Sequence, residues 1–259
     1  MNTKLFDVDS GLLSLGLIAT LSLATWLSSL WRKDVSIVDG MWPVFIASGG
    51  GVYAVMAPQL GAPAVVAFAL LFLWGARLAI HITLRNHGQP EDRRYQKIRA
   101  NNQPHFELKS LYIVFGLQAA LAWVVALPFM ATRAADDFGV LATIGTMVTA
   151  FGLVFEAIAD WQLEQFKKRK DSHGKVLDTG LWRYSRHPNY FGECCAWWGF
   201  GLIALGTGAW WALASPLLMT VLLLKVSGVT MLEKDIGERR PEYQRYVRET
   251  NAFVPWRRL

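Results

Sequence analysis

Polar side chains stand four residues apart at three places inside otherwise apolar stretches of the chain. A spacing of four residues puts side chains on one face of a helix. Ionisable groups inside membrane helices are costly and usually face a bundle interior or a wet cavity. The sequence therefore predicts a functional polar cavity. The three sets are Arg77, His81 and Arg85; Glu156 and Asp160; and Asn189 and Glu193.

The stretches that carry these sets have the composition of membrane helices. Of the 259 residues, 53% are hydrophobic and 12 are tryptophan, which points away from a soluble fold. Residues 11–31 carry no charge over about 20 positions, enough to cross a bilayer, and in lipid only a helix satisfies an open backbone. We predict an all-α, integral membrane bundle in a single domain, 1–259, with seven transmembrane helices at 11–31, 35–57, 62–85, 110–131, 138–166, 189–206 and 209–232.

Lysine and arginine are distributed unevenly among the predicted connections. They gather after residue 31, in 85–109, in 167–186 and in the tail, whereas the connections near 58–61, 132–137 and 207–208 carry almost none. The positive-inside rule then places the N-terminus outside and the C-terminus in the cytoplasm. The polar sets, with Asp39, fall in the cytoplasmic half. Because the net charge of +6 comes from these loops, we expect no nucleic-acid partner.

Polar loops border the predicted cavity. Pro90 followed by EDRRYQKIR predicts a short interfacial helix, and the alternating charges of the tail predict an amphipathic helix on the membrane face. The cations of 167–186 favour phosphate binding, and the GGG at 49–51 favours close helix packing. No dinucleotide-binding glycine motif follows a predicted strand, and the histidines form no metal shell, so we expect a diffusible cofactor and no metal.

Several motifs together resemble the steroid 5α-reductase family, most closely its bacterial branch of DUF1295-type membrane reductases. The strongest is Arg-His-Pro-Asn-Tyr-Phe-Gly-Glu at 186–193, preceded by Thr-Gly-Leu-Trp-Arg-Tyr-Ser at 179–185. Further matches are Trp-Gly-Ala-Arg-Leu at 74–78, Glu-Asp-Arg-Arg-Tyr at 91–95 and the ending Tyr-x-x-Tyr…Phe-x-Pro-Trp at 243–256. The likeness runs from about residue 35 onward, and its family-like C-terminal region is 110–259. It implies an enzyme of a bacterial inner membrane that takes NADPH from the cytoplasm and reduces a conjugated C=C bond in a lipophilic enone.

The resemblance also implies roles for particular residues at the cofactor. Asp160, Asn189 and Glu193 match positions that hold NADPH, and Asn86 matches another. Lys167 stands where the family has an arginine near the phosphates, which keeps the charge but loses the bidentate fork.

For the substrate, the resemblance places Asp39 at a glutamate that contacts the carbonyl and Trp74 at a catalytic tyrosine. An indole N–H donates a hydrogen bond but supplies no proton at neutral pH. A buried and protonated Asp39 is therefore the expected acid, with Tyr53 and Tyr95 as other candidates.

Two other functions fit the same sequence. The shorter core Arg-His-Pro-x-Tyr-x-Gly also occurs in membrane methyltransferases of lipids and isoprenoids that use S-adenosylmethionine, and Trp74 in place of tyrosine suits a non-catalytic sterol-binding protein. Asn189 and Glu193 favour the reductase, whose partners are a lipophilic substrate and membrane lipid, while the oligomeric state stays open. The expected catalytic residues are Asp39, Trp74 and Tyr53, and the expected NADPH-binding residues are Arg77, Arg85, Asn86, Arg93, Tyr95, Glu156, Asp160, Lys167, Tyr184, Arg186, His187, Asn189, Glu193, Arg239 and Tyr243.

Overall fold

The computed structural model describes residues 6–170, 172, 174–226 and 241–257, and throughout these ranges the regular structure is helical, without a strand. The chain divides into two compact units, of which unit 1 is Met1–Ala142 with Ile203–Ser215 and unit 2 is Thr143–Leu202 with Pro216–Leu259. Each unit is described by itself. The all-α prediction is confirmed, whereas the single domain stays a prediction.

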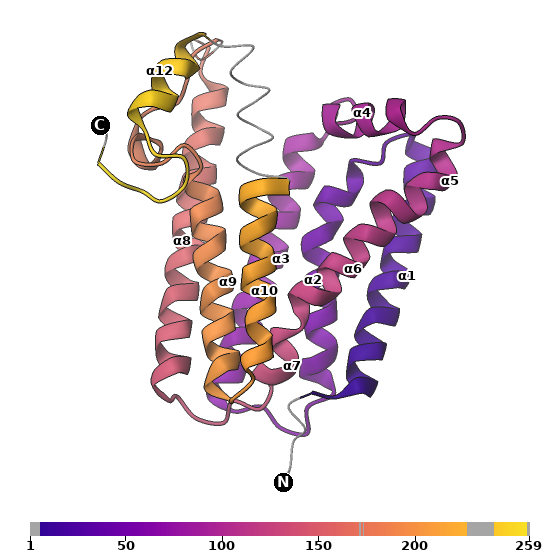
Figure 1. The fold of residues 1–259 in the computed structure, drawn as a ribbon, viewed down its shortest axis with the longest axis vertical. Coiled ribbons are helices and arrows are strands. Elements are labelled where there is room, and N and C mark those ends of the chain that lie inside the picture. The colour runs from indigo at the N-terminus through magenta and orange to yellow at the C-terminus, as the bar shows by residue number, and fades with distance from the viewer. Residues whose placement is uncertain (1–5, 171, 173, 227–240, 258–259) are drawn as a thin grey trace. The chain divides into compact units, whose positions relative to one another are not determined.

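Unit 1 is built around one short apolar helix, α2. This helix packs against α1, α3, α6 and α7 (Figure 1). Its triple glycine allows this, because a Cβ on Gly49 would come within 2.7 Å of Ile18 and one on Gly50 within 2.4 Å of Leu71. The prediction of close packing at the GGG is confirmed. The helices of unit 1 are α1 (Val8–Arg32), α2 (Ile37–Val55), α3 (Ala62–Asn86), α4 (Arg93–Asn101), α5 (Phe106–Ser110), π-helix η1 (Leu111–Gly116), α6 (Leu117–Ala126), α7 (Pro128–Thr132) and η3 (Trp210–Leu213).

Unit 2 is centred on two long helices, α8 and α9, that run side by side (Figure 1). Glycines let their backbones touch, since a Cβ on Gly152 would lie 2.5 Å from the backbone nitrogen of Ala196, and one on Gly199 would lie 2.2 Å from Thr149 Oγ1. Close approach of this kind is how helices associate in lipid, where apolar burial supplies little driving force. The helices of unit 2 are α8 (Val140–Lys168), 3₁₀ helix η2 (Gly180–Arg183), α9 (Pro188–Gly206), α10 (Ala214–Val221), π-helix η4 (Leu222–Val226) and α12 (Pro241–Glu249), with α8 and α9 extending into unit 1 at one end.

Four of these helical segments are long and apolar enough to cross a membrane, which supports the prediction of a membrane protein. They are Val8–Arg32, Ala62–Asn86, Phe106–Thr132 and Val140–Lys168, and a shorter apolar helix covers Trp210–Lys225. The predicted spans 35–57 and 189–206 form α2 and α9, each of 19 residues. Each of the seven predicted spans thus contains helix, while the number that cross the membrane and the orientation stay predictions.

Candidate functional site

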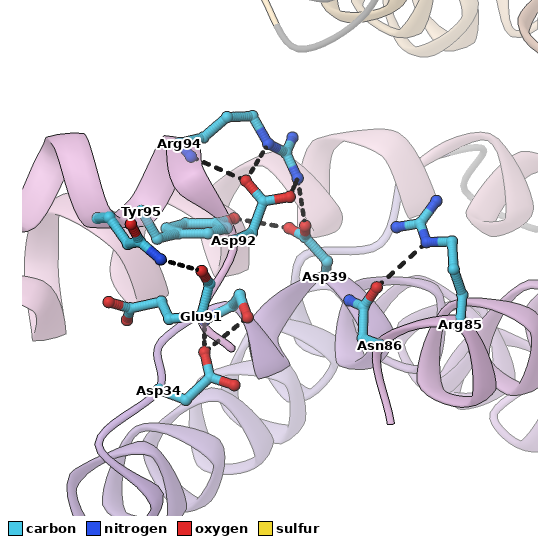
Figure 2. A network of polar contacts seen from close by, with 10 residues as sticks. Asp34, Asp39, Arg85, Asn86, Glu91, Asp92, Arg94 and Tyr95 are labelled. Atoms are coloured by element: carbon cyan, nitrogen blue, oxygen red, sulfur yellow. Dashed lines mark hydrogen bonds and ion pairs between the residues drawn. The ribbon is translucent and has the colours of Figure 1, made fainter. Parts of the chain in front are cut away.

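The carboxylate of Asp39 is the centre of a polar network at one end of unit 1 (Figure 2). Asp39 lies in the first turn of α2. Its Oδ2 accepts a hydrogen bond from Arg94 Nη2 at 2.6 Å, and its Oδ1 accepts one from the Tyr95 hydroxyl at 2.6 Å. Both partners come from α4, which lies across this end of unit 1 (Figure 1). A carboxyl group is thus brought together with a guanidinium 55 residues later and a phenol 56 residues later.

Helix α4 is the short helix predicted after Pro90, and two acidic residues fix its position. Asp92 caps its N-terminus by accepting from Arg94 N at 2.8 Å, and it also accepts from Arg94 Nε at 2.9 Å. Glu91 accepts from the backbone nitrogen of Val35 at 2.9 Å and from Arg99 Nη2 at 2.8 Å. An N-cap stabilises the first turn, and Glu91 ties that turn to the α1–α2 connection. Arg94 therefore reaches Asp39 from a firmly held helix.

The protonation of this network follows from its surroundings. Burial raises the pKa of Tyr95 well above 10.0, and the adjacent carboxylate of Asp39 raises it further. Burial acts to lower the pKa of Arg94, but the charges of Asp39 and Asp92 outweigh it and raise that pKa. The phenol is therefore neutral and the guanidinium charged at physiological pH.

Asp39, the expected acid, is engaged at both oxygens of its carboxyl group. Arg94 pairs with one oxygen at 2.6 Å, and the Tyr95 hydroxyl donates to the other. The side chain of Asp39 is 17% exposed, and its role as an acid stays a prediction. Tyr95, expected at the cofactor and as an alternative acid, serves in this network as a hydrogen-bond donor.

The three expected catalytic residues lie at different depths in unit 1. Tyr53 follows Asp39 by 14 residues on α2, which is about 21 Å along a helix. Helix α3 runs antiparallel to α2, since a Cβ on Gly40 would lie 2.9 Å from Thr83 Oγ1 and one on Gly75 would lie 2.9 Å from Ala47. This register puts Trp74 roughly 14 Å from the level of Asp39. The structure therefore does not gather Asp39, Trp74 and Tyr53 around one carbonyl.

The other expected cofactor residues of unit 1 differ in exposure. Arg77 is partly buried, Arg85 and Arg93 are exposed, and Asn86 is partly buried at the end of α3. Arg85 Nε donates to Asn86 Oδ1 at 3.1 Å (Figure 2). Because Gly40 contacts Thr83, the end of α3 that carries Arg85 and Asn86 lies beside the start of α2.

Unit 2 holds a second polar group, which we call the α8–α9 half-site: Glu156, Asp160, Asn189 and Glu193. Asn189 Nδ2 donates to Asp160 Oδ1 at 3.1 Å. Three acidic side chains, those of Glu156, Asp160 and Glu193, are exposed by only 2%, 8% and 7%. A Cβ on Gly192 would lie 2.6 Å from the backbone nitrogen of Glu156. The absence of a side chain at Gly192 therefore lets α9 bring Asn189 and Glu193 against α8.

Residues expected at the rim of the cofactor site are divided between surface and interior. Lys167 and Tyr184 are exposed, as phosphate or base contacts must be. Arg186 and His187, also expected at NADPH, are only 8% and 4% exposed, and Arg186 donates to the backbone carbonyls of Val247 and Thr250. Tyr243 is also buried and packs edge-on against Tyr246, with ring centroids 5.8 Å apart.

Arg239, also expected at the cofactor, lies outside the described residues.

Two arginines that form ion pairs in unit 1 were not predicted from the sequence. Arg94 belongs to the Glu-Asp-Arg-Arg-Tyr motif at 91–95. The spacing of an N-cap aspartate at 92 and an arginine at 94 is the signal that could have predicted the pair Asp92–Arg94. Arg133 forms a part-buried ion pair with Asp7 at 3.0 Å, 126 positions away in the sequence, and no local pattern predicts it.

The comparisons with known proteins agree with the membrane character of these helices. Residues 25–250 match the family described as "Protein of unknown function (DUF1295)", and the chain therefore belongs to that family. An uncharacterized protein of Schizosaccharomyces pombe is 26% identical over 271 residues, which cover 89% of this chain and 75% of the relative. No solved structure matches the chain significantly.

Proposed function

We propose that this protein is an NADPH-dependent membrane reductase that transfers hydride to the conjugated C=C bond of a lipophilic enone. The observation that carries the proposal is the α8–α9 half-site, in which Asn189 is held by Asp160 one helical turn from Glu193. A carboxamide such as that of nicotinamide needs one hydrogen-bond acceptor for its NH₂ and one donor for its carbonyl. A carboxylate and an amide four residues apart on one helix supply both.

Bound NADPH would supply a hydride ion, which is a proton with two electrons, to the β-carbon of the enone. The protein's task is to orient the carboxamide through Asn189 and Glu193 and to polarise the carbonyl of the substrate. The exposed cation of Lys167 suits a phosphate. The α-carbon would take its proton from water, by way of the enol, so that hydride from NADPH and one proton from solvent together convert the C=C bond to a CH–CH bond and leave NADP⁺.

Tyr95 is the hydrogen-bond donor that unit 1, taken by itself, could offer to the oxygen of a ligand. Its hydroxyl donates to Asp39 in the resting protein, and rotation about the C–O bond redirects that donor to an incoming oxygen. Arg94 stays paired with Asp39 at 2.6 Å when this happens, so the carboxylate is not left without a partner. Because Asp39 keeps its contact with Arg94, turning the Tyr95 hydroxyl toward a ligand costs less free energy than it would in an isolated Tyr–Asp pair.

Binding of nicotinamide by the purified protein tests the proposal. We expect wild-type protein in detergent to bind NADPH and to oxidise it when an enone is added. Glu193→Ala should weaken NADPH binding about 10- to 100-fold, because it removes a hydrogen bond to a charged group. Glu164→Ala is the matched control, since Glu164 lies on α8 in an exposed pair with Lys168 at 2.8 Å.

Two results contradict the reductase. Binding of S-adenosylmethionine without binding of NADPH would assign the protein to the methyltransferases that share the shorter motif. A co-purified lipid without NADPH oxidation in the presence of any enone would instead assign it a non-catalytic lipid-binding function.

A further inference from the structure

Three of the four residues that precede α9 are hydrogen-bonded to the C-terminal segment, by which we mean Tyr243–Trp256. Trp256 N donates to the carbonyl of Tyr184 at 2.9 Å, and Arg186 N donates to the carbonyl of Asn251 at 2.9 Å. Between them, Ser185 Oγ donates to the carbonyl of Phe253 at 2.8 Å. The backbone from Tyr184 to Arg186 is therefore held from outside.

Arg186 makes the most direct connection. Its Nη1 donates to the carbonyls of Val247 and Thr250 at 2.8 and 2.5 Å. Helix α12 ends at Glu249, so the carbonyl of Val247 lies in its last turn and that of Thr250 directly after it, where a helix leaves acceptors unsatisfied and carries partial negative charge. A buried guanidinium at this position caps the helix. The motif arginine thus binds the protein's own helix end, which presents the same kind of acceptor as a phosphate.

Tyr246 supplies a second connection from the same helix. Its hydroxyl hydrogen-bonds the carbonyl of Trp182 and lies 3.2 Å from that of Ser185. The Ser185 hydroxyl in turn accepts from His187 N at 3.1 Å. Helix α9 begins at the next residue, Pro188. The chain of contacts therefore runs from α12 through Ser185 to the first turn of α9, where Asn189 points to Asp160.

The other side of this connection is fixed by α8. Trp182 Nε1 donates to the carbonyl of Ala159 at 3.0 Å, and Leu181 N donates to Gln162 Oε1 at 2.9 Å. Gly180 adopts φ +62°, and a Cβ there would lie 2.6 Å from Gln162 Oε1. The segment 180–187 is thus hydrogen-bonded to α8 on one side and to the C-terminal segment on the other. Release of the C-terminal segment would leave only the contacts with α8.

We infer that the C-terminal segment is a clasp that positions Asn189 for the cofactor, with Arg186 and Tyr246 as positioning residues. The inference rests on the proposed function for the identity of the cofactor. Because linkage is reciprocal, bound NADPH must then tighten the clasp by the same free energy that the clasp adds to NADPH binding. The ending Tyr-x-x-Tyr…Phe-x-Pro-Trp and the Arg-His-Pro-Asn motif are in this view two halves of one structural element.

Tyr246→Phe tests the clasp with the smallest change of volume. We expect amide exchange in the peptide 185–191 to accelerate about tenfold without any ligand, because two carbonyls lose their donor. The dissociation constant of NADPH should also rise, by the factor by which the variant lowers the fraction of protein with Asn189 in position. Arg186→Gln should do the same, and Arg186→Lys, which keeps a donor and the charge, should recover part of the loss.

Thr149→Val is the matched control for general loss of stability. It removes a buried hydrogen bond to the carbonyl of Ala196 on the same pair of helices, away from the clasp. It should lower the melting temperature as much as Tyr246→Phe does, but leave NADPH binding and the exchange of 185–191 unchanged. An equal loss of NADPH binding in Thr149→Val, or unchanged exchange in Tyr246→Phe, overturns the inference. Failure of the wild type to bind NADPH refutes the proposed function, whereas the ligand-free exchange still decides whether the clasp exists.

Discussion

A single methyl group added to Gly192 should separate α8 from α9 and disable the half-site between them. A Cβ at this position would lie 2.6 Å from the backbone nitrogen of Glu156 and 2.8 Å from the carbonyl of Gly152. Both are backbone atoms of α8, so no side chain can rotate away. Ordinary van der Waals contact begins at 3.4 Å, and the difference of about 0.8 Å must come from movement of a helix.

The consequence for Asn189 follows from the same distance. Its bond to Asp160 is 3.1 Å long and starts three residues before Gly192. A separation of about 0.8 Å takes this bond beyond the range of a hydrogen bond. Overpacking of this kind costs about 1–3 kcal/mol, which exceeds the gain of up to about 1 kcal/mol from replacing glycine by alanine in a helix. We therefore expect Gly192→Ala to be less stable and to bind NADPH at least tenfold more weakly.

The assay compares two glycine-to-alanine variants in detergent. Gly16→Ala is the control, because Gly16 lies in the interior of α1 and a Cβ there would meet nothing within 4 Å. Thermal unfolding should show a lower melting temperature for Gly192→Ala and an equal or slightly higher one for Gly16→Ala. If Gly192→Ala keeps both its melting temperature and its NADPH affinity, the close contact of α8 and α9 does not hold the half-site together.

Two further predictions concern the network of unit 1. A double-mutant cycle of Tyr95→Phe and Asp39→Ala, followed by denaturant unfolding, should give a coupling of about 0.5–1.5 kcal/mol for the part-buried hydrogen bond between these residues; a coupling near zero would refute the pairing. Burial acts to raise the pKa of Glu91, but hydrogen bonds from Arg99 and Val35 outweigh it and hold that pKa below 4.5. The stability that this provides is complete above pH 4.5 and is lost as the pH falls through the lowered value. Melting temperatures between pH 7 and 3 should show that loss in the wild type and a smaller one in Arg99→Gln.

Several features of the fold could be predicted because their signals are local. Residues 11–31 without charge predict a membrane helix, and α1 covers Val8–Arg32. Pro90 and the residues after it predict a short helix, and α4 follows at Arg93–Asn101. The spacing of Asn189 and Glu193 places them on one helix face before any contact is known. In each case the physical cause, apolar length, capping or the 3.6-residue period, acts within a few turns.

The partners of Asp39 show the limit of local signals. The sequence places this residue about one turn inside a predicted helix but does not indicate what its carboxyl group contacts. Arg94 and Tyr95 come from a different helix, 55 and 56 residues later, and both donate hydrogen bonds to it. The sequence contains all three residues but not the fact that they meet.

By itself, the sequence determined that this chain forms apolar helices with polar groups at helical spacing, because composition and periodicity act along the chain. Only the tertiary structure decided what those groups contact. Arg186 is the clearest case, since a guanidinium binds a phosphate and a helix C-terminus through the same donors. The docking of α12, more than 50 residues further on, gave it the carbonyls of Val247 and Thr250, and with them a place in the interior of unit 2.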